Sequence, residues 1–177
     1  MKIPFLKVLG PTIVILILDQ ISKAWVRSSM ALWESHRVLG EHFFRLTHVQ
    51  NTGVAFGMQA GSRIFLILFS IAASLFLLYI LLKAHRDNQP QYPPPVRFAL
   101  ALILGGALGN LIDRVLFGQV TDFLDFDFPD FIMERWPVFN VADSAVTVGV
   151  TLWIISLVFF HKPVEKSPQA SPPVEHA

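Results

Sequence analysis

Four long apolar stretches restrict what this chain can fold into. They cover residues 5–26, 64–82, 98–117 and 141–160, and each is close to the ~20 helical residues that cross the hydrocarbon core of a bilayer. Hydrophobic residues make up 53% of the chain and charged residues only 15%, which is too apolar for an ordinary soluble domain. The sequence therefore predicts an all-α polytopic membrane protein with four transmembrane helices.

Length and composition set the domain organisation and exclude several classes of function. We expect one membrane domain over residues 1–162 and a disordered cytoplasmic tail over residues 163–177, where proline, serine and charged residues accumulate. The chain has no cysteine, which excludes disulfides, thiolate metal sites and cysteine nucleophiles. The net charge of +1 comes without a basic patch, so we expect no nucleic-acid partner.

The segment between the first two apolar stretches has a different pattern. Apolar and polar residues alternate over residues 38–49, which predicts a small, half-exposed β element outside the cytoplasm. His36, His42 and His48 lie in or near it, but no acid or cysteine completes a ligand set at helical spacing. We therefore expect solvated or interfacial histidines and no metal site.

Unusual polar residues lie at the ends of the apolar stretches. An ionisable residue within a membrane segment is a functional candidate by default, because it is costly there. Antiparallel helices with short connections bring the ends of the first and third stretches to the same face as the starts of the second and fourth. That shared face would hold Asp19, Lys23, Asn51, Asn110, Asp113, Arg114, Asp122, Asn140 and Asp143.

Several of these residues allow two interpretations. Asp19 and Lys23 are either a self-neutralising pair at helical spacing or part of a site. A nucleophile made of Ser22 and Lys23 is disfavoured, because adjacent helical residues do not face each other. Asn51 with Gly53 fits a glycine turn before the second stretch, and Asp143 fits an acid in the first turn of a helix that Asn140 caps.

The segment 118–138 is expected to be an interfacial loop. Its acids Asp125, Asp127, Asp130 and Glu134 alternate with aromatic residues and would keep them in solution, so composition does not single out Asp122. A hairpin through residues 123–138 would bring Asp122 close to Asp143. Two carboxylates around one water, one protonated and one ionised, suit general acid–base hydrolysis.

Five ordered blocks of sequence carry a family resemblance. They read DQISK at residues 19–23, NTGVAF at 51–56, GGALGNLIDR at 105–114, GQVTDF at 118–123 and FNVADS at 139–144. Together they resemble the signature blocks of signal peptidase II, the bacterial prolipoprotein signal peptidase, over roughly residues 8–160.

The resemblance implies an aspartic endopeptidase without metal or cofactor. Its substrate would be a prolipoprotein whose cysteine carries a diacylglyceryl group, cut on the amino side of that cysteine. The resemblance makes Asp122 and Asp143 the catalytic pair. It assigns substrate binding or support of the site to Asn51, Gly53, Asn110, Arg114, Asn140, Asp19 and Lys23. Besides the substrate we expect membrane lipid as a partner, and a monomer.

The location also depends on the resemblance. It implies a multi-pass protein of the bacterial inner membrane, with cytoplasmic termini and the site at the outer leaflet. Lysines and arginines are equally numerous on the two faces, so the positive-inside rule favours this orientation only after Lys23 and Arg114 are set aside as motif residues. A proton-coupled transporter and a non-catalytic scaffold are the alternatives. The transporter is disfavoured because the acids lie at helix ends and no inverted repeat is visible.

Overall fold

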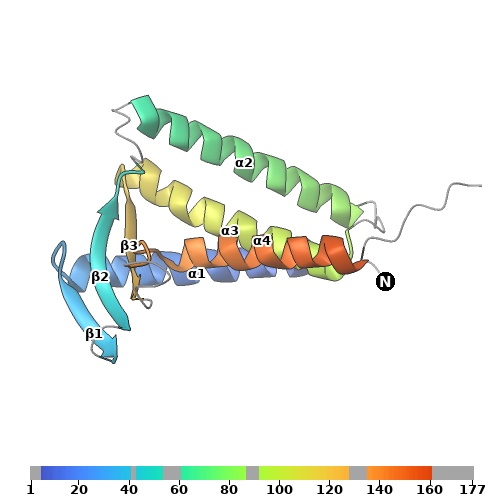
Figure 1. Cartoon of the computed structure of the whole chain (residues 1–177). Coiled ribbons are helices and arrows are strands. Elements are labelled where there is room, and N and C mark those ends of the chain that lie inside the picture. The colour runs from blue at the N-terminus through green and yellow to red at the C-terminus, as the bar shows by residue number, and fades with distance from the viewer. Residues whose placement is uncertain (1–4, 41–42, 54–60, 87–91, 128–134, 161–177) are drawn as a thin grey trace, which may run out of the picture.

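The protein forms four long helices with a small sheet across one end (Figure 1). The computed structural model describes residues 5–40, 43–53, 61–86, 92–127 and 135–160. The helices are α1 (Phe5–Ser29), α2 (Gly61–Arg86), α3 (Pro94–Leu116) and α4 (Val141–Phe160), and each is long and apolar enough to cross a membrane. The predicted fold class is therefore confirmed. His42, residues 54–56, Asp130, Glu134 and the tail 163–177 lie outside the described residues.

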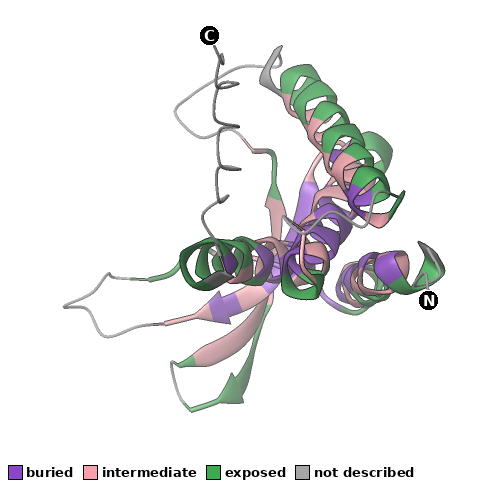
Figure 2. Cartoon of the chain, turned by 90° about the vertical axis from the view of Figure 1, so that its right-hand side faces the viewer, coloured by how far each residue is buried: buried purple, intermediate pink, exposed green. Residues whose placement is uncertain are grey.

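Helix α3 is the centre of the bundle, because its small residues let two neighbours approach closely. Gly105 faces Ile15 and the backbone oxygen of Thr12 on α1, while Gly106 faces the backbone oxygen of Ala142 on α4. A methyl group at either glycine would crowd or overlap these atoms. Figure 2 shows the buried residues gathered at the middle of the bundle. The two glycines therefore allow close packing of the helices.

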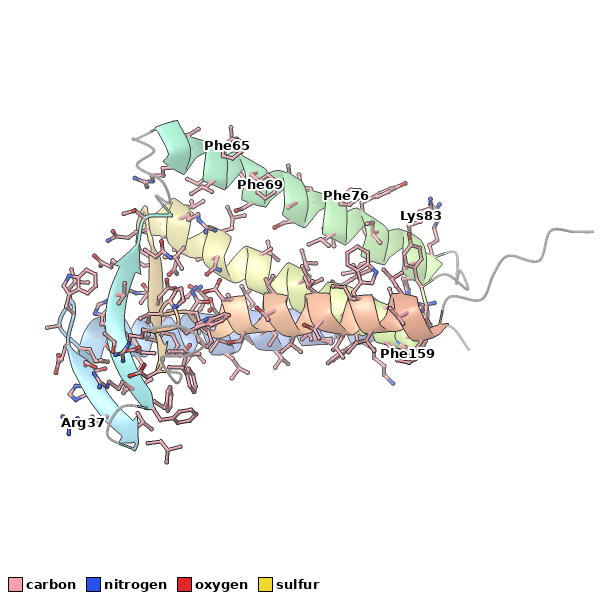
Figure 3. All side chains as sticks on the ribbon, in the orientation of Figure 1. Arg37, Phe65, Phe69, Phe76, Lys83 and Phe159 are labelled. Atoms are coloured by element: carbon pink, nitrogen blue, oxygen red, sulfur yellow. The ribbon has the colours of Figure 1, made fainter. Side chains whose placement is uncertain are left out.

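The outer surface of the bundle is apolar. Phe65, Phe69 and Phe76 project outward from α2, and Phe159 from the end of α4 (Figure 3); each is more than 60% exposed. Exposed apolar patches of this extent are rare on soluble monomers, but lipid tails would cover them. The charged Arg37 and Lys83 lie at opposite ends of the molecule (Figure 3).

The sheet is antiparallel and has three strands in the order β1-β2-β3. The hairpin of β1 (Ser35–Leu39) and β2 (Phe44–Asn51) confirms the predicted β element. The third strand, β3 (Val120–Phe126), corrects the expectation that this part of segment 118–138 is a loop. It pairs with β2 from Phe44↔Phe126 to Asn51↔Val120.

Two side chains expected in solvent are buried instead. Asp125 is only 3% exposed and accepts hydrogen bonds from Arg135 Nε (2.7 Å), Arg135 Nη2 (2.9 Å) and Thr47 Oγ1 (2.5 Å). His48 is 5% exposed, and its Nδ1 lies 3.0 Å from the backbone oxygen of Met30. Each is buried because it has a specific polar partner. The prediction of a solvated side chain was wrong at Asp125, and of the two alternatives for His48, solvated or interfacial, the solvated one was wrong.

Candidate active site

Asp122 lies on β3, where the sheet meets the helix bundle. Its side chain is 1% exposed. Oδ1 accepts a hydrogen bond from Asn140 Nδ2 at 2.6 Å, and Oδ2 accepts one from Asn51 Nδ2 at 3.0 Å. The carboxyl group thus connects β3 to the end of β2 and to the start of α4.

Asp143 lies in the first turn of α4 and forms a reciprocal cap with Asn140. The backbone N–H of Asp143 donates to Asn140 Oδ1 (2.9 Å), and the backbone N–H of Asn140 donates to Asp143 Oδ2 (3.2 Å). This is the arrangement of a capping box. The remaining oxygen, Oδ1, accepts from Asn110 Nδ2 at 2.7 Å. The capping interpretation is therefore correct, and it leaves one carboxylate oxygen directed at the site.

Two buried asparagines join the two carboxylates. Asn140 Nδ2 also donates to Asn110 Oδ1, at 3.1 Å, so the chain of contacts runs from Asp122 through Asn140 and Asn110 to Asp143. Asn140 is 0% exposed and Asn110 is 8% exposed. Residues from β3, α3 and α4 are thereby fixed relative to one another, and the expected proximity of Asp122 and Asp143 is present.

The surroundings of Asp122 favour its protonated form. The pKa of Asp122 is raised to about 6. Burial is the main cause and the charge of Asp143 adds to it, while the hydrogen bonds from Asn51 and Asn140 and the charge of Lys23 lower the pKa. Asp122 lies on a strand beyond the end of α3, so burial and not a helix dipole is the main cause of the raised pKa.

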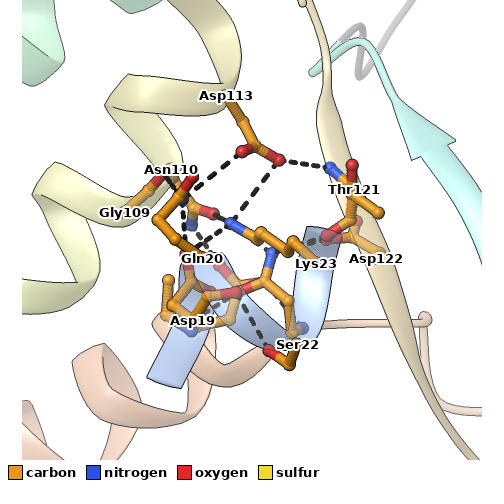
Figure 4. A network of polar contacts seen from close by, with 12 residues as sticks. Asp19, Gln20, Ser22, Lys23, Gly109, Asn110, Asp113, Thr121 and Asp122 are labelled. Atoms are coloured by element: carbon orange, nitrogen blue, oxygen red, sulfur yellow. Dashed lines mark hydrogen bonds and ion pairs between the residues drawn. The ribbon is translucent and has the colours of Figure 1, made fainter. Parts of the chain in front are cut away.

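The pair Asp19 and Lys23 faces this site from α1 (Figure 4). Both side chains are fully buried, and Lys23 Nζ lies 2.9 Å from Asp19 Oδ2. Lys23 also donates to Asn110 Oδ1 at 2.9 Å, and Asp19 Oδ1 accepts from the backbone N–H of Ala142 at 2.9 Å. The hydroxyl of Ser22 donates to the backbone oxygen of Asp19. The pair therefore belongs to the interior of the site and does not reach toward solvent.

Asp113 is the buried acid that the sequence interpretation undervalued. It is 0% exposed, and its Oδ2 accepts the backbone N–H of Thr121 at 2.9 Å, directly before Asp122 (Figure 4). Lys23 Nζ lies 3.7 Å and Arg27 Nη1 3.5 Å from its carboxylate oxygens. The sequence feature that could have identified Asp113 was its position three residues after Asn110, on the same helix face.

Arg114 and Gly53 lie at the edge of the site. In the part of the chain that the structure describes, Arg114 Nη1 donates to Ser70 Oγ (3.5 Å) and makes no hydrogen bond to either aspartate. Gly53 has a φ of +70°, which favours glycine, and its N–H donates to Asn51 Oδ1 at 2.8 Å. The glycine turn thus holds the asparagine that contacts Asp122.

An apolar cavity adjoins Asp143. Its volume is about 420 Å³, and it is lined by Phe126, Trp136, Phe139, Asp143, Ser144, Thr147 and Val148. Phe126 and Phe139 stack with ring centroids 5.8 Å apart. A carboxylate at the edge of an apolar cavity suits a substrate with an apolar segment next to the reacting bond. Among the described residues, no group of histidines and acids is arranged to hold a metal ion.

Comparisons with known proteins identify the family. The profile of Signal peptidase (SPase) II matches residues 11–159. The chain belongs to the signal peptidase II family. Membership in a peptidase family removes the transporter and scaffold alternatives.

Individual members of the signal peptidase II family are similar over most of their length. The lipoprotein signal peptidase of Desulforapulum autotrophicum is 44% identical over 150 residues, which cover 82% of this chain and 88% of that protein. The lipoprotein signal peptidase of Syntrophus aciditrophicus is 38% identical over 173 residues, which cover 94% of this chain and 100% of that protein.

Two solved structures described as a bacterial membrane enzyme, determined by the in meso method at 2.3 and 1.9 Å resolution, are each 34% identical to this chain. Their TM-scores are 0.73 and 0.75, and the matches cover 91% and 86% of this chain and 94% and 93% of theirs.

Proposed function

We propose that this chain is a membrane aspartic endopeptidase that removes the signal peptide from diacylglyceryl-modified prolipoproteins, cutting on the amino side of the lipidated cysteine. One observation carries the proposal: Asp122 and Asp143 are joined through two buried asparagines beside an apolar cavity. The family and the names of its members support the same substrate class.

In the proposed reaction Asp143 is the general base and Asp122 the general acid. Both oxygens of Asp143 accept N–H groups, which suits an ionised carboxylate. Asp143 takes a proton from a water as the water oxygen bonds to the scissile carbonyl carbon. Asp122 then gives its proton to the amide nitrogen as the carbon–nitrogen bond breaks.

The other polar residues are proposed to bind the substrate or support the pair. Asn51 and Gly53 are at least partly accessible and Arg114 is half-buried, so these three are placed to bind the substrate backbone. Asn110 and Asn140 orient the carboxylates, and Asp19 with Lys23 supports them from α1. The apolar exterior of the helices leaves the acyl chains of the substrate in lipid while the peptide bond meets water.

The decisive experiment uses the purified full-length protein in detergent with a diacylglyceryl-modified precursor. We expect a shorter product from the wild type. Asp122→Asn and Asp143→Asn should each lower turnover by about a hundredfold to ten-thousandfold, because each role needs a titratable carboxyl group. Asp127→Asn is the control. Asp127 comes directly after β3, close in sequence to Asp122, and its ion pair with Arg135 is a long one, at 3.8 Å.

No cleavage by the wild type would overturn the function, and near-normal turnover by Asp122→Asn or Asp143→Asn would overturn the roles.

We also propose an inner-membrane monomer surrounded by lipid, with cytoplasmic termini and the site at the outer leaflet. The sheet that carries Asp122 and the first turn of α4 that carries Asp143 lie at the same end of the helices (Figure 1). The orientation can therefore be tested with two fusions. A reporter that works only outside the cytoplasm should be active after Gly61 and inactive after Arg86. The reverse pattern would contradict this orientation.

A further inference from the structure

The side chain of Asn110 lies at the centre of the contacts between the two aspartates. Its Oδ1 accepts from Lys23 Nζ (2.9 Å) and from Asn140 Nδ2 (3.1 Å). Its Nδ2 donates to Asp143 Oδ1 (2.7 Å). The two ends of this amide group therefore have opposite partners, and its orientation decides which hydrogen bond Asp143 receives.

Shape alone does not fix that orientation. The oxygen and nitrogen of an asparagine amide are nearly the same size, so a rotation by 180° fills the same space. In the rotated form the amide NH₂ group would face the Lys23 ammonium, donor against donor. The amide oxygen would then face the carboxylate of Asp143, acceptor against acceptor.

Lys23 and Asn140 both donate to Asn110 Oδ1 and favour the same orientation, and Lys23 is the charged donor of the two. An ammonium group has three donors and no acceptor, so only the oxygen of Asn110 can bind it. The ammonium is held in place by Asp19 at 2.9 Å and Asp113 at 3.7 Å, and all three side chains are 0% exposed. A buried group of charges such as this adds little net stability compared with apolar residues of similar size, which favours a role other than stability.

We propose that Lys23 is a positioning residue, which fixes the amide orientation of Asn110 and thereby makes Asp143 the hydrogen-bond acceptor and general base of the pair. The inference rests on the proposed function. Lys23 acts through Asn110, since its described contacts are to Asp19, Asn110 and Asp113. It does not enter the reaction itself.

The test must separate the orientation of the amide from the general effect of removing a positive charge. Arg27 supplies the matched control, because Arg27 Nη1 lies 3.5 Å from Asp113 and 3.0 Å from Thr121 Oγ1, and Asn110 is not among its described partners. The charged groups around Asp122 and Asp143 are Asp19, Lys23 and Arg27 on α1 and Asp113 and Arg114 on α3.

The experiment compares Lys23→Met with Arg27→Met in detergent, with a lipidated precursor, over a range of pH. In Lys23→Met we expect kcat to fall at least about tenfold with KM within about twofold of the wild type, from the loss of a hydrogen bond to a charged group. The acid-side limb of the pH–rate profile should move to higher pH, because ionised Asp143 loses a donor whenever the amide rotates. In Arg27→Met the acid-side limb should lie at the same pH as in the wild type.

Two further variants allow for a Lys23→Met protein that fails to fold. Asp19→Asn combined with Lys23→Met removes both charges of the ion pair and leaves no unpaired Asp19 carboxylate. Asn110→Leu removes the donor to Asp143 without adding a charge. Both should show the same movement of the acid-side limb.

The role of Lys23 would be overturned if the acid-side limb of the pH–rate profile stayed at its wild-type pH in every folded variant. It would also be overturned if Arg27→Met moved that limb by the same amount. The proposed function would still stand if the wild type cleaves the precursor and the Asp122 and Asp143 variants do not.

Discussion

Asp122 is a single acidic residue held in an environment that is unfavourable for its charge. Its carboxyl group is 1% exposed, has no cationic hydrogen-bond partner among the described residues and interacts with the charge of Asp143. Burial raises its pKa to about 6 from an ordinary value of 3.8. The ionised form is therefore less stable in the folded protein than in the unfolded chain, so this position works against stability at neutral pH.

The sign of this effect leads to a prediction about stability. Because the folded protein binds the proton of Asp122 more tightly than the unfolded chain does, the contribution of Asp122 to stability falls as the pH rises from about 4 to about 6 and is constant above that. The full change is about 3 kcal/mol. The melting temperature of the wild type minus that of Asp122→Asn, measured in detergent, should decrease from pH 4 to pH 8. An unchanged or increasing difference would contradict the raised pKa.

The sequence allowed some site residues to be identified and not others. Asp122 was distinguished from the neighbouring acids only by its motif, because composition says nothing of burial. Asp125 looked equivalent to Asp127, yet Arg135 and Thr47 keep Asp125 inside the sheet. These partners lie 10 and 78 positions away in the chain, so no local pattern shows them.

At the level of elements, the site depends on how closely α4 approaches α3. Gly106 of α3 meets the backbone of Ala142, next to Asp143, and Gly149 further along α4 meets the backbone oxygen of Ala99. With no side chain at these two positions, the helix backbones are nearly in contact. The distance between Asn110 and Asp143 is thus set by glycines outside the site itself.

We predict that Gly106→Ala lowers both activity and melting temperature. The added methyl group would overlap the Ala142 backbone and the Val146 side chain, and separation of the helices should cost about 1–3 kcal/mol. Gly10→Ala on α1 is the matched control, because nothing lies within 4 Å of its added methyl group and alanine favours the helix. Equal effects of the two substitutions on melting temperature in detergent would show that close packing at Gly106 is unimportant.

The elements themselves differed in how well the sequence predicted them. The four helices were evident because apolar runs of this length have few alternatives. Strand β3 was missed because its acids Asp122 and Asp125 are buried, and buried acids are unusual. Its burial depends on partners in β2, α1 and α3, so it becomes apparent only in the assembled fold.

At the level of the whole molecule, the apolar exterior distinguishes this fold from a soluble helical bundle. Leu75, Phe76 and Tyr79 on α2 are each close to 60% exposed, while the buried charges lie at the sheet end of the helices. This is the reverse of the usual arrangement in water, and it is stable only where lipid covers the helices.

Phe76 gives a test of this environment. Phe76→Lys should reduce insertion into the membrane, because a lysine near the middle of a transmembrane helix costs about 2.5–3.5 kcal/mol. Phe76→Leu should insert normally, since leucine is equally suited to lipid. The measurement is the membrane-integrated fraction of each variant after synthesis in the presence of vesicles. Equal insertion of the two variants would indicate that this face of α2 does not contact lipid.

The hydrogen bond between Asp19 and the backbone N–H of Ala142 joins positions 123 residues apart, in the first and the last helix. The two carboxylates likewise come from β3 and from the first turn of α4. While the ribosome is still making the protein, the nascent chain therefore holds three helices and one carboxylate of the pair, with neither Asn140 nor Asp143 present. With Asp122 and Asp143 as the proposed catalytic pair, we predict that the chain gains proteolytic activity only after α4 has entered the bilayer.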